Sequence, residues 1–103
     1  MYARTTTIHA AKDRIDAGLR EFREIVAEFH GLDGFMGAEF MVDRRLGRVV
    51  ATTFWETEAA MLDSERRADE RRALAAEILG STISPSVERF QVLYSEMRQP
   101  TAR

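Results

Sequence analysis

The stretch GFMGAEFMVDRRLGRVVATTFWETEAAM, residues 34–61, decides the predicted fold of this chain. Two runs suited to β-strands, 38–42 and 48–55, flank the polar connection DRRLG, so the stretch predicts a β-hairpin. Thr57 follows at once and has a side-chain oxygen that can cap a helix. The sequence therefore predicts that the second strand of the hairpin leads directly into a helix.

The segments on either side of this stretch complete the predicted order of elements. The β-branched run TTTIH predicts a first strand within 2–10, and apolar residues at helical spacing predict a helix over about 13–30. The second helix is expected to bend or break near 66–70 and to end at Gly80, and SVERFQVLYSEM predicts a final strand. The order β-α-β-β-α-β is typical of the ferredoxin-like α+β fold, a four-stranded antiparallel sheet with both helices on one face.

The second strand of the hairpin is largely apolar on both of its faces. Alternation places Val50, Thr52 and Phe54 on one face, and the residues between them on the other. The helices of this fold cover only one face of the sheet, so the other face needs a separate cover. We expect a homodimer, in which the uncovered faces of two sheets pack against each other.

Length and composition indicate one folded domain. The chain has 103 residues, of which 45% are apolar and 31% are charged, as is usual for a globular protein. Residues 2–96 are expected to form the folded core, and residues 97–103 a flexible tail.

Charge and residue content exclude several classes of partner and chemistry. Fifteen basic and seventeen acidic residues give a net charge of −2. The chain therefore lacks the excess positive charge that is typical of proteins that bind nucleic acid or an anionic membrane. No apolar run approaches the roughly 20 residues that span a bilayer, and the N-terminus does not resemble a signal peptide, so we expect a cytoplasmic location. The chain contains no cysteine, which excludes disulfides, thiolate metal sites and a cysteine nucleophile.

Three stretches carry a family resemblance: GFMGAEFMVD, GRVVATTFWETEAAM and VERFQVLY resemble the antibiotic biosynthesis monooxygenase family over about residues 2–96. The charged segment SERRADERRALAAE looks most like that of uncharacterised actinobacterial members. The resemblance implies the dimeric α+β barrel fold, with a pocket between sheet and helices. Members differ in activity: some oxidise polycyclic or quinol substrates without a cofactor, some degrade haem, and many have no known activity.

Haem degradation is not expected for this chain. Haem-degrading members carry an Asn, a Trp and a His at positions that correspond here to Thr6, Ser64 and Ala73. Without an imidazole on the second helix, iron would lack its proximal ligand. His9 and His30, the two histidines, lack a third ligand nearby, so we predict no metal site and expect no cofactor.

The first functional hypothesis is a cofactor-independent monooxygenase acting on a small aromatic or quinol-like compound. Such an enzyme needs an apolar pocket, a group that helps to remove a proton, and a group that stabilises the resulting oxyanion. The catalytic candidates are His9 as general base, Arg4 for the oxyanion and Tyr94 as a hydrogen-bond donor. The candidates for substrate binding are Thr6, Phe22, Thr52, Phe54, Met61 and Phe90.

Each candidate also has an ordinary structural explanation, because apolar residues at helical spacing form cores and Thr is favoured in strands. The alternative hypothesis is a non-catalytic protein that binds a small apolar ligand, or a purely structural dimeric α+β barrel. A cavity with at least two convergent polar groups would favour catalysis. Closure of that space by Phe22, Phe54 and Met61 would weaken both ligand-based hypotheses.

The run ERRADERRALAAE is the most highly charged segment of the chain. Its mixed charges at i,i+4 spacing indicate a solvated helix face. The other interpretation is a site for an acidic ligand, built from Arg66, Arg67, Arg71 and Arg72.

Overall fold

The computed structural model describes residues 1–98, so residues 99–103 of the predicted tail lie outside the described part. The elements follow the predicted order, with a short 3-10 helix, η1, before the first α-helix and a break in the second helix. Their bounds are β1 (Tyr2–His9), η1 (Lys12–Arg14), α1 (Ile15–Phe29), β2 (Phe35–Asp43), β3 (Arg48–Trp55), α2 (Glu58–Asp63), α3 (Glu65–Ile78) and β4 (Ser86–Gln91).

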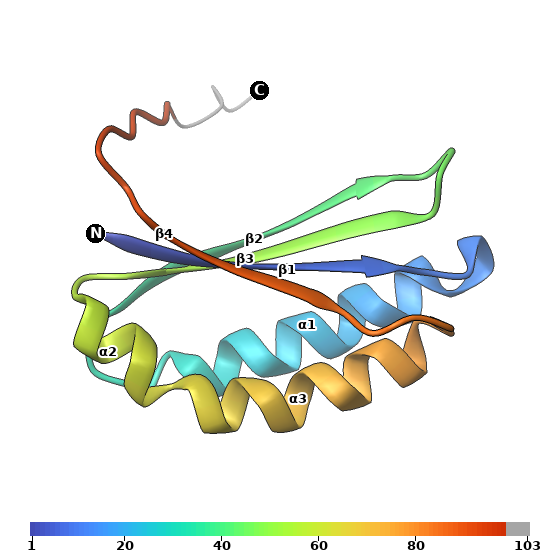
Figure 1. The fold of residues 1–103 in the computed structure, drawn as a ribbon, viewed down its shortest axis with the longest axis horizontal. Coiled ribbons are helices and arrows are strands. Elements are labelled where there is room, and N and C mark those ends of the chain that lie inside the picture. Colours follow the sequence, from blue (N-terminus) through green and yellow to red (C-terminus); the bar gives the residue numbers. More distant parts are fainter. Residues whose placement is uncertain (99–103) are drawn as a thin grey trace, which may run out of the picture.

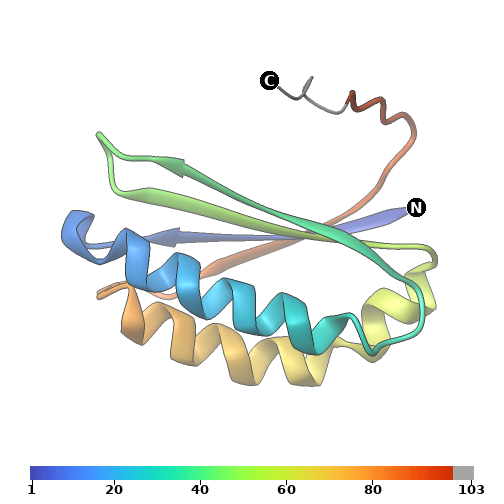
Figure 2. The same ribbon diagram turned by 180° about the vertical axis from the view of Figure 1, so that it is seen from behind.

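The four strands form one antiparallel sheet in the order β2-β3-β1-β4. α1 and α3 lie side by side on the same face of this sheet, as Figure 1 shows, and Figure 2 shows the same layers from behind. This confirms the predicted ferredoxin-like α+β fold. The register pairs Thr6 of β1 with Ala51 of β3, and Ala51 with Phe40 of β2, so these three residues share the helix-covered face.

The break in the second helix falls at Ser64, earlier than the predicted region 66–70. Thr57 caps α2 as predicted, since its hydroxyl accepts a hydrogen bond from the backbone N–H of Ala60 at 3.1 Å. At the break, the hydroxyl of Ser64 donates to the carbonyl oxygen of Met61 at 2.7 Å. A side chain that bonds to the backbone in this way competes with helical hydrogen bonding, which explains why the break lies here.

The final strand is shorter than SVERFQVLYSEM, because β1 begins at Tyr2 and the pairing of β4 with it ends at Gln91. One further hydrogen bond follows, from the N–H of Val92 to the carbonyl oxygen of Met1 at 2.8 Å. At the other predicted helix end, Gly80 has a φ of +70° and terminates α3 as expected.

Helical spacing predicts that the buried face of α1 is the apolar stripe of Ile15, Leu19, Phe22, Val26 and Phe29, widened by Ile25, and the observed buried face is turned relative to it. Its buried residues are Ile15, Gly18, Glu21, Ile25 and Phe29. The observed buried face thus includes a charged residue, Glu21. Its carboxylate is stabilised there by an ion pair with Arg71 of α3 at 3.2 Å. Helical spacing alone could not show this, since the partner is on another helix.

The sheet face opposite the helices carries the second set of alternating residues. Val50, Thr52 and Phe54 lie on this face of β3. Register places Met41 of β2 beside Val50, and places Phe90 of β4 on the same face beyond β1, where it pairs with Ala3. Met41 and Phe90 are each 49% exposed, and no element within residues 1–98 covers this face.

Candidate functional site

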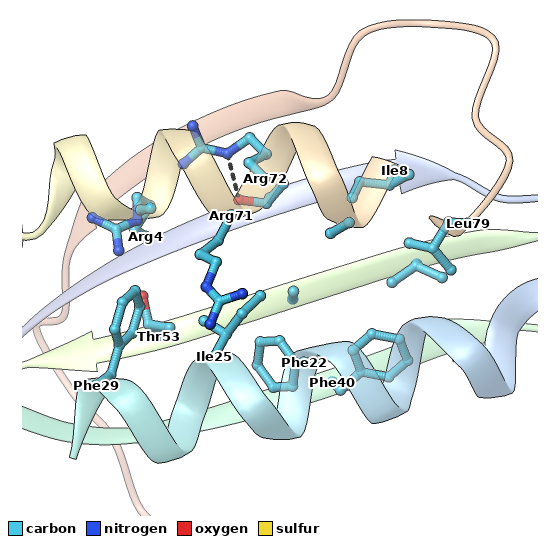
Figure 3. A pocket seen from close by; sticks show the side chains of 15 residues that line it. Arg4, Ile8, Phe22, Ile25, Phe29, Phe40, Thr53, Arg71, Arg72 and Leu79 are labelled. Carbon is cyan, nitrogen blue, oxygen red and sulfur yellow. Dashed lines mark hydrogen bonds between the residues drawn. The ribbon is translucent and has the colours of Figure 1, made fainter. Parts of the chain in front are cut away.

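A cavity of about 60 Å³ lies between the helix-covered face of the sheet and the two long helices. β1, β2, β3, α1 and α3 all contribute to its wall (Figure 3). The apolar part of the lining includes Phe22, Ile25, Phe29, Phe40, Val49 and Leu79. The polar part consists of Arg4, Thr6, Thr53, Arg71 and Arg72. A mostly apolar lining with a few polar groups is typical of small-molecule sites.

Arg4 is the most deeply buried charged residue of this lining, with only 3% of its surface exposed. Its Nη1 atom donates to the carbonyl oxygen of Met61 at 3.1 Å and to Oγ of Ser64 at 2.9 Å, and it lies 3.3 Å from a carboxylate oxygen of Glu65. The guanidinium carbon also lies 5.6 Å from the ring centre of Trp55, at cation–π distance. Nη2, in contrast, is buried and has no hydrogen-bond partner.

The charged groups around Arg4 do not fully compensate the free-energy cost of burying its guanidinium group. Desolvation lowers the pKa of Arg4 below its ordinary value, the nearby carboxylate of Glu65 opposes this shift, and repulsion from Arg72 and Arg89 adds to it. Arg89 shares Glu65, donating to its two carboxylate oxygens at 2.6 and 2.8 Å, and these hydrogen bonds are the largest cause of the lowered pKa of Glu65. Arg4 stays protonated because an arginine pKa starts so high.

Arg72 reaches the cavity from α3. Its Nε atom donates to the hydroxyl of Thr6 at 3.4 Å (dashed in Figure 3), and its Nη1 atom pairs with Asp69. Its side chain is only 13% exposed, so this arginine belongs to the site and not to the solvated face of α3.

Arg71 bridges the two helices that roof the cavity. In Figure 3 its side chain extends from α3 toward α1, where it pairs with Glu28 at 2.7 Å and with Glu21 at 3.2 Å. The hydrogen bonds to Glu28 raise the pKa of Arg71. These ion pairs link α1 to α3 along the line where the two helices meet.

Three of the predicted site residues line the cavity: Arg4, Thr6 and Phe22. Met61 lies next to it, with its side chain in a core cluster that contains Phe29 and Trp55. Its contribution to the site is its carbonyl oxygen, which accepts from Arg4.

Thr52, Phe54 and Phe90 do not line the cavity, because they lie on the opposite face of the sheet. Side chains alternate between the two faces of a strand, and on β3 it is Ala51 and Thr53 that point toward the helices. The sequence pattern showed two apolar faces but could not show which one the helices cover.

His9 and Tyr94 also lie away from the cavity. His9 is an exposed residue at the end of β1. Tyr94 follows β4, is 79% exposed, and donates from its hydroxyl to Glu96 at 2.6 Å, which raises its pKa. Neither side chain is placed to act as a general base or donor in this cavity.

The cavity also contains Phe40 and Thr53, which were not among the candidates. Arg71 and Arg72 line it as well, whereas Arg66 and Arg67, the other two arginines of the possible acidic-ligand site, do not. Arg72 left a signal in the sequence, because it interrupts the apolar row of the second helix at a position that should face the sheet. Nothing in the sequence marked Thr53 as a residue of the site. In the structure its hydroxyl accepts a hydrogen bond from Nε1 of Trp55 at 2.9 Å.

Within the described residues, no three His, Cys, Asp or Glu side chains gather where they could hold a metal ion. No helix of residues 1–98 combines the length and apolar character needed to cross a bilayer.

Comparison with known proteins identifies a family and several relatives by sequence. The sequence model of the family described as "Antibiotic biosynthesis monooxygenase" matches residues 1–77. The uncharacterised protein Rv2557 of Mycobacterium tuberculosis is 40% identical over 93 residues, which are 89% of this chain and 41% of that protein. A second uncharacterised protein of that organism, Rv2558, is 34% identical over 102 residues, 98% of this chain and 42% of its own length. The chain thus spans about two fifths of the curated relatives it matches.

A solved structure shares the fold. It is the crystal structure of a monooxygenase from the gene ActVA-Orf6 of Streptomyces coelicolor, in complex with the ligand nanaomycin D. It superimposes with a TM-score of 0.75, covering 95% of this chain and 92% of that one, at 16% sequence identity. At this identity the likeness concerns the fold alone.

Proposed function

The chain belongs to the antibiotic biosynthesis monooxygenase family, and on this premise we propose that it oxidises a small aromatic or quinol-like compound with molecular oxygen and without a cofactor. The observation that carries the proposal is Arg4, a buried arginine that lines an apolar cavity and whose Nη2 atom has no hydrogen-bond partner. An apolar wall suits an aromatic ring, and an unpaired guanidinium N–H suits the oxygen on which charge develops.

The proposed reaction is balanced without an external reductant. An ionised phenol or quinol transfers an electron to O₂, and the two radicals combine to form a carbon–oxygen bond. The resulting peroxide loses water together with the ring C–H proton, which leaves a quinone carbonyl. One phenol and one O₂ thus give one quinone and one water, because the substrate itself supplies the electrons.

Arg4 is the residue we propose to hold the substrate oxygen, with Arg72 as the second cation near it. None of the described residues that line the cavity is an Asp, Glu or His. The hydroxyl therefore loses its proton to water, and the two guanidinium groups lower its pKa because they stabilise the anion.

Entry of a substrate requires the cavity to widen. Its volume of about 60 Å³ is well below the ~300 Å³ at the lower end for ligand pockets. Phe22 and Phe40, whose ring centres are 5.3 Å apart, and Arg71 at the helix seam are the side chains whose movement would enlarge it.

Oxygen consumption tests the proposal directly. The protein is assayed with a panel of quinols and anthrones in the presence of a metal chelator. We expect one O₂ consumed per substrate oxidised, and a loss of about 10²-fold or more in rate for Arg4→Gln, as for removal of an oxyanion donor. Arg66→Gln removes the same charge from a side chain of α3 that is 94% exposed, and should behave as wild type. If no panel member is consumed above the rate in buffer, the proposal is wrong for this substrate class.

The second candidate function is non-catalytic binding of a small ligand in the same cavity. Two observations favour it: the cavity is narrow, and no acid–base residue is among the described residues that line it. Saturable binding of a quinol without oxygen consumption would distinguish it from the oxygenase.

We also propose that the chain forms a homodimer through the uncovered sheet face. Met41 and Phe90 leave apolar surface on this face, and beyond β4 the side chains of Leu93 and Tyr94 are 87% and 79% exposed. Burial of such surface favours association. Sedimentation velocity at micromolar concentration should show a dimer, and Met41→Glu should shift it to the monomer. A wild-type monomer under these conditions would contradict the proposal.

A further inference from the structure

α1 carries a row of apolar side chains that the sheet does not bury. Leu19, Phe22 and Val26 are only half-buried, whereas Ile25 and Phe29 of the same helix are buried. At spacing i, i+3 and i+7 the three half-buried residues lie on one side of the helix. Figure 2 shows that β2, an edge strand of the sheet, runs beside α1.

A groove of about 520 Å³ lies between α1 and β2. Besides the apolar row on α1, its lining consists of Arg23, His30, Phe35, Gly37, Ala38 and Phe40. Among the residues of 1–98 that line it, only Arg23 and His30 have polar side chains, and both are exposed. A mostly apolar concave surface of this volume falls within the range of small-molecule sites, about 300–1,000 Å³.

The groove adjoins the cavity at one pair of aromatic residues. Phe22 and Phe40 line both spaces, and no other residue of the described part does so. Their rings are in contact, with centres 5.3 Å apart and planes inclined at 42°. Figure 3 shows the two rings side by side at the α1 side of the cavity. The boundary between groove and cavity therefore lies at this ring pair, and rotation of the two side chains would connect the two spaces.

The other way into the cavity, between α1 and α3, is held by ion pairs. Arg71 lies 2.7 Å from Glu28 and 3.2 Å from Glu21, and Arg67 lies 3.5 Å from the same Glu28. Separating the helices there would break charge-assisted hydrogen bonds, which are stronger than neutral ones. Separating the aromatic rings breaks only packing contacts, so the ring pair opens at lower cost.

The two volumes show why the spaces need each other. The cavity measures about 60 Å³, less than half of the ~150 Å³ of an apolar cavity that holds benzene. The groove has room for aromatic rings but only two exposed polar side chains. We propose that the groove is an outer subsite for a flat aromatic ligand of two or more rings, and that Phe22 and Phe40 form the gate through which one ring enters the cavity. This rests on the cavity of the proposed function, and it names the entry route and the shape of the substrate.

A series of neutral aromatic amines tests the shape of the site. Aniline, 1-aminonaphthalene and 1-aminoanthracene have the same polar group on one, two and three rings. Trp55, the only tryptophan, reports binding by fluorescence quenching, because its ring lies 5.3 Å from that of Phe35 in the groove and 5.6 Å from that of Phe29 in the cavity. We expect one molecule bound per chain and a gain of ~10-fold in affinity for each added ring, because each ring buries more apolar surface. Equal affinities across the series, or no saturable binding of 1-aminoanthracene, would overturn the proposal.

Variants that fill each space locate the ligand. Ala38 lines only the groove and Ala75 only the cavity. Ala38→Phe and Ala75→Leu should each weaken 1-aminoanthracene by ~10-fold, whereas Ala73→Phe, at an exposed position of α3, should bind it as wild type does. Val26→Gln, which makes the groove polar, replaces Ala38→Phe if that variant fails to fold. An effect of only one of the two filled spaces would mean that the ligand does not extend through the gate, and the proposal would be wrong.

The rate of association distinguishes the two entry routes. Stopped-flow quenching of Trp55 measures this rate for 1-aminoanthracene. Phe22→Ala removes one half of the gate and should raise the rate by ~10-fold or more, because binding no longer waits for a conformational change. Arg71→Gln removes the ion pairs between α1 and α3 and should leave the rate unchanged. The reverse result would place the entrance between the helices and refute the gate.

The other possible occupant of the groove is a second copy of the chain. Sedimentation velocity should give the same assembly for Ala38→Phe as for wild type, since the proposed homodimer uses the uncovered sheet face. A changed assembly without binding of 1-aminoanthracene would assign the groove to a protein interface and overturn the proposal. The amines bind without oxygen chemistry, so the expected binding and kinetics with no oxygen consumption on the quinol panel would reject the oxygenase and leave this inference standing.

Discussion

The substitution Gly18→Ala tests how closely α1 packs against the end of α3. Gly18 is buried in α1, and a Cβ atom there would lie 2.2 Å from Cδ2 of Leu79 and 2.8 Å from its Cγ. Leu79 is 1% exposed and packs in a cluster with Ile8, Ile15 and Val49, so it has little room to retreat. It also lines the cavity, so its displacement would narrow the proposed site.

Two opposing effects set the expected magnitude. Gly→Ala inside a helix stabilises by about 1 kcal/mol through helix propensity. Overpacking of a core destabilises by about 1–3 kcal/mol. The clash with Leu79 is close enough to prevail, so Gly18→Ala should lower the free energy of unfolding by up to ~2 kcal/mol. The sign is the test, because propensity alone predicts the opposite change.

Urea unfolding of a small set of variants measures both effects. Ala27→Gly, at an exposed position of α1, calibrates the propensity effect and should destabilise by about 1 kcal/mol. Leu79→Ala should destabilise by about 2–5 kcal/mol. In that background Gly18→Ala should become stabilising, since the clashing atoms are gone. If Gly18→Ala stabilises the wild type by the full propensity effect, or its effect is unchanged in the Leu79→Ala background, the packing argument is refuted.

Three further predictions concern core, charge and capping. Phe29→Ala should destabilise by about 3–5 kcal/mol because Phe29 is 1% exposed, and Phe22→Ala by clearly less because Phe22 is only partly buried at the cavity wall; urea midpoints compare them. Arg89 and Arg4 lower the pKa of Glu65 in the folded state. The ion pairs of Glu65 therefore stabilise the fold fully above its unfolded pKa of about 4.3, and this stabilisation is lost as the pH falls through the lower pKa that Glu65 has in the folded state. The stability difference between wild type and Glu65→Gln should therefore be largest near neutral pH and shrink below about pH 4; a constant difference across a pH series of melts would contradict this. Thr57→Ala should cost about 1 kcal/mol through loss of the cap on the N–H of Ala60, and a thermal melt indistinguishable from wild type would refute it.

The predictable part of the site is the part with a local signal. Arg4 and Phe22 could be proposed because an arginine in a predicted strand and an aromatic residue in a helical stripe can both be recognised from the sequence. Phe54 and Phe90 were equally apolar, but they lie on the sheet face away from the helices. Tyr94 was expected within a longer last strand, which instead ends at Gln91 where its partner strand ends.

The order of elements, the hairpin and the antiparallel α+β fold follow from the sequence by itself, because periodicity, turn residues and caps act over a few neighbouring positions. Only the tertiary structure decided which face of β3 meets the helices and which charges end up together. Arg4, Glu65 and Arg89 come from three different elements, and their distances depend on how α3 crosses β1 and β4. The unpaired Nη2 of Arg4 arises from that crossing, since burial and partners are properties of the packed chain and not of any single segment.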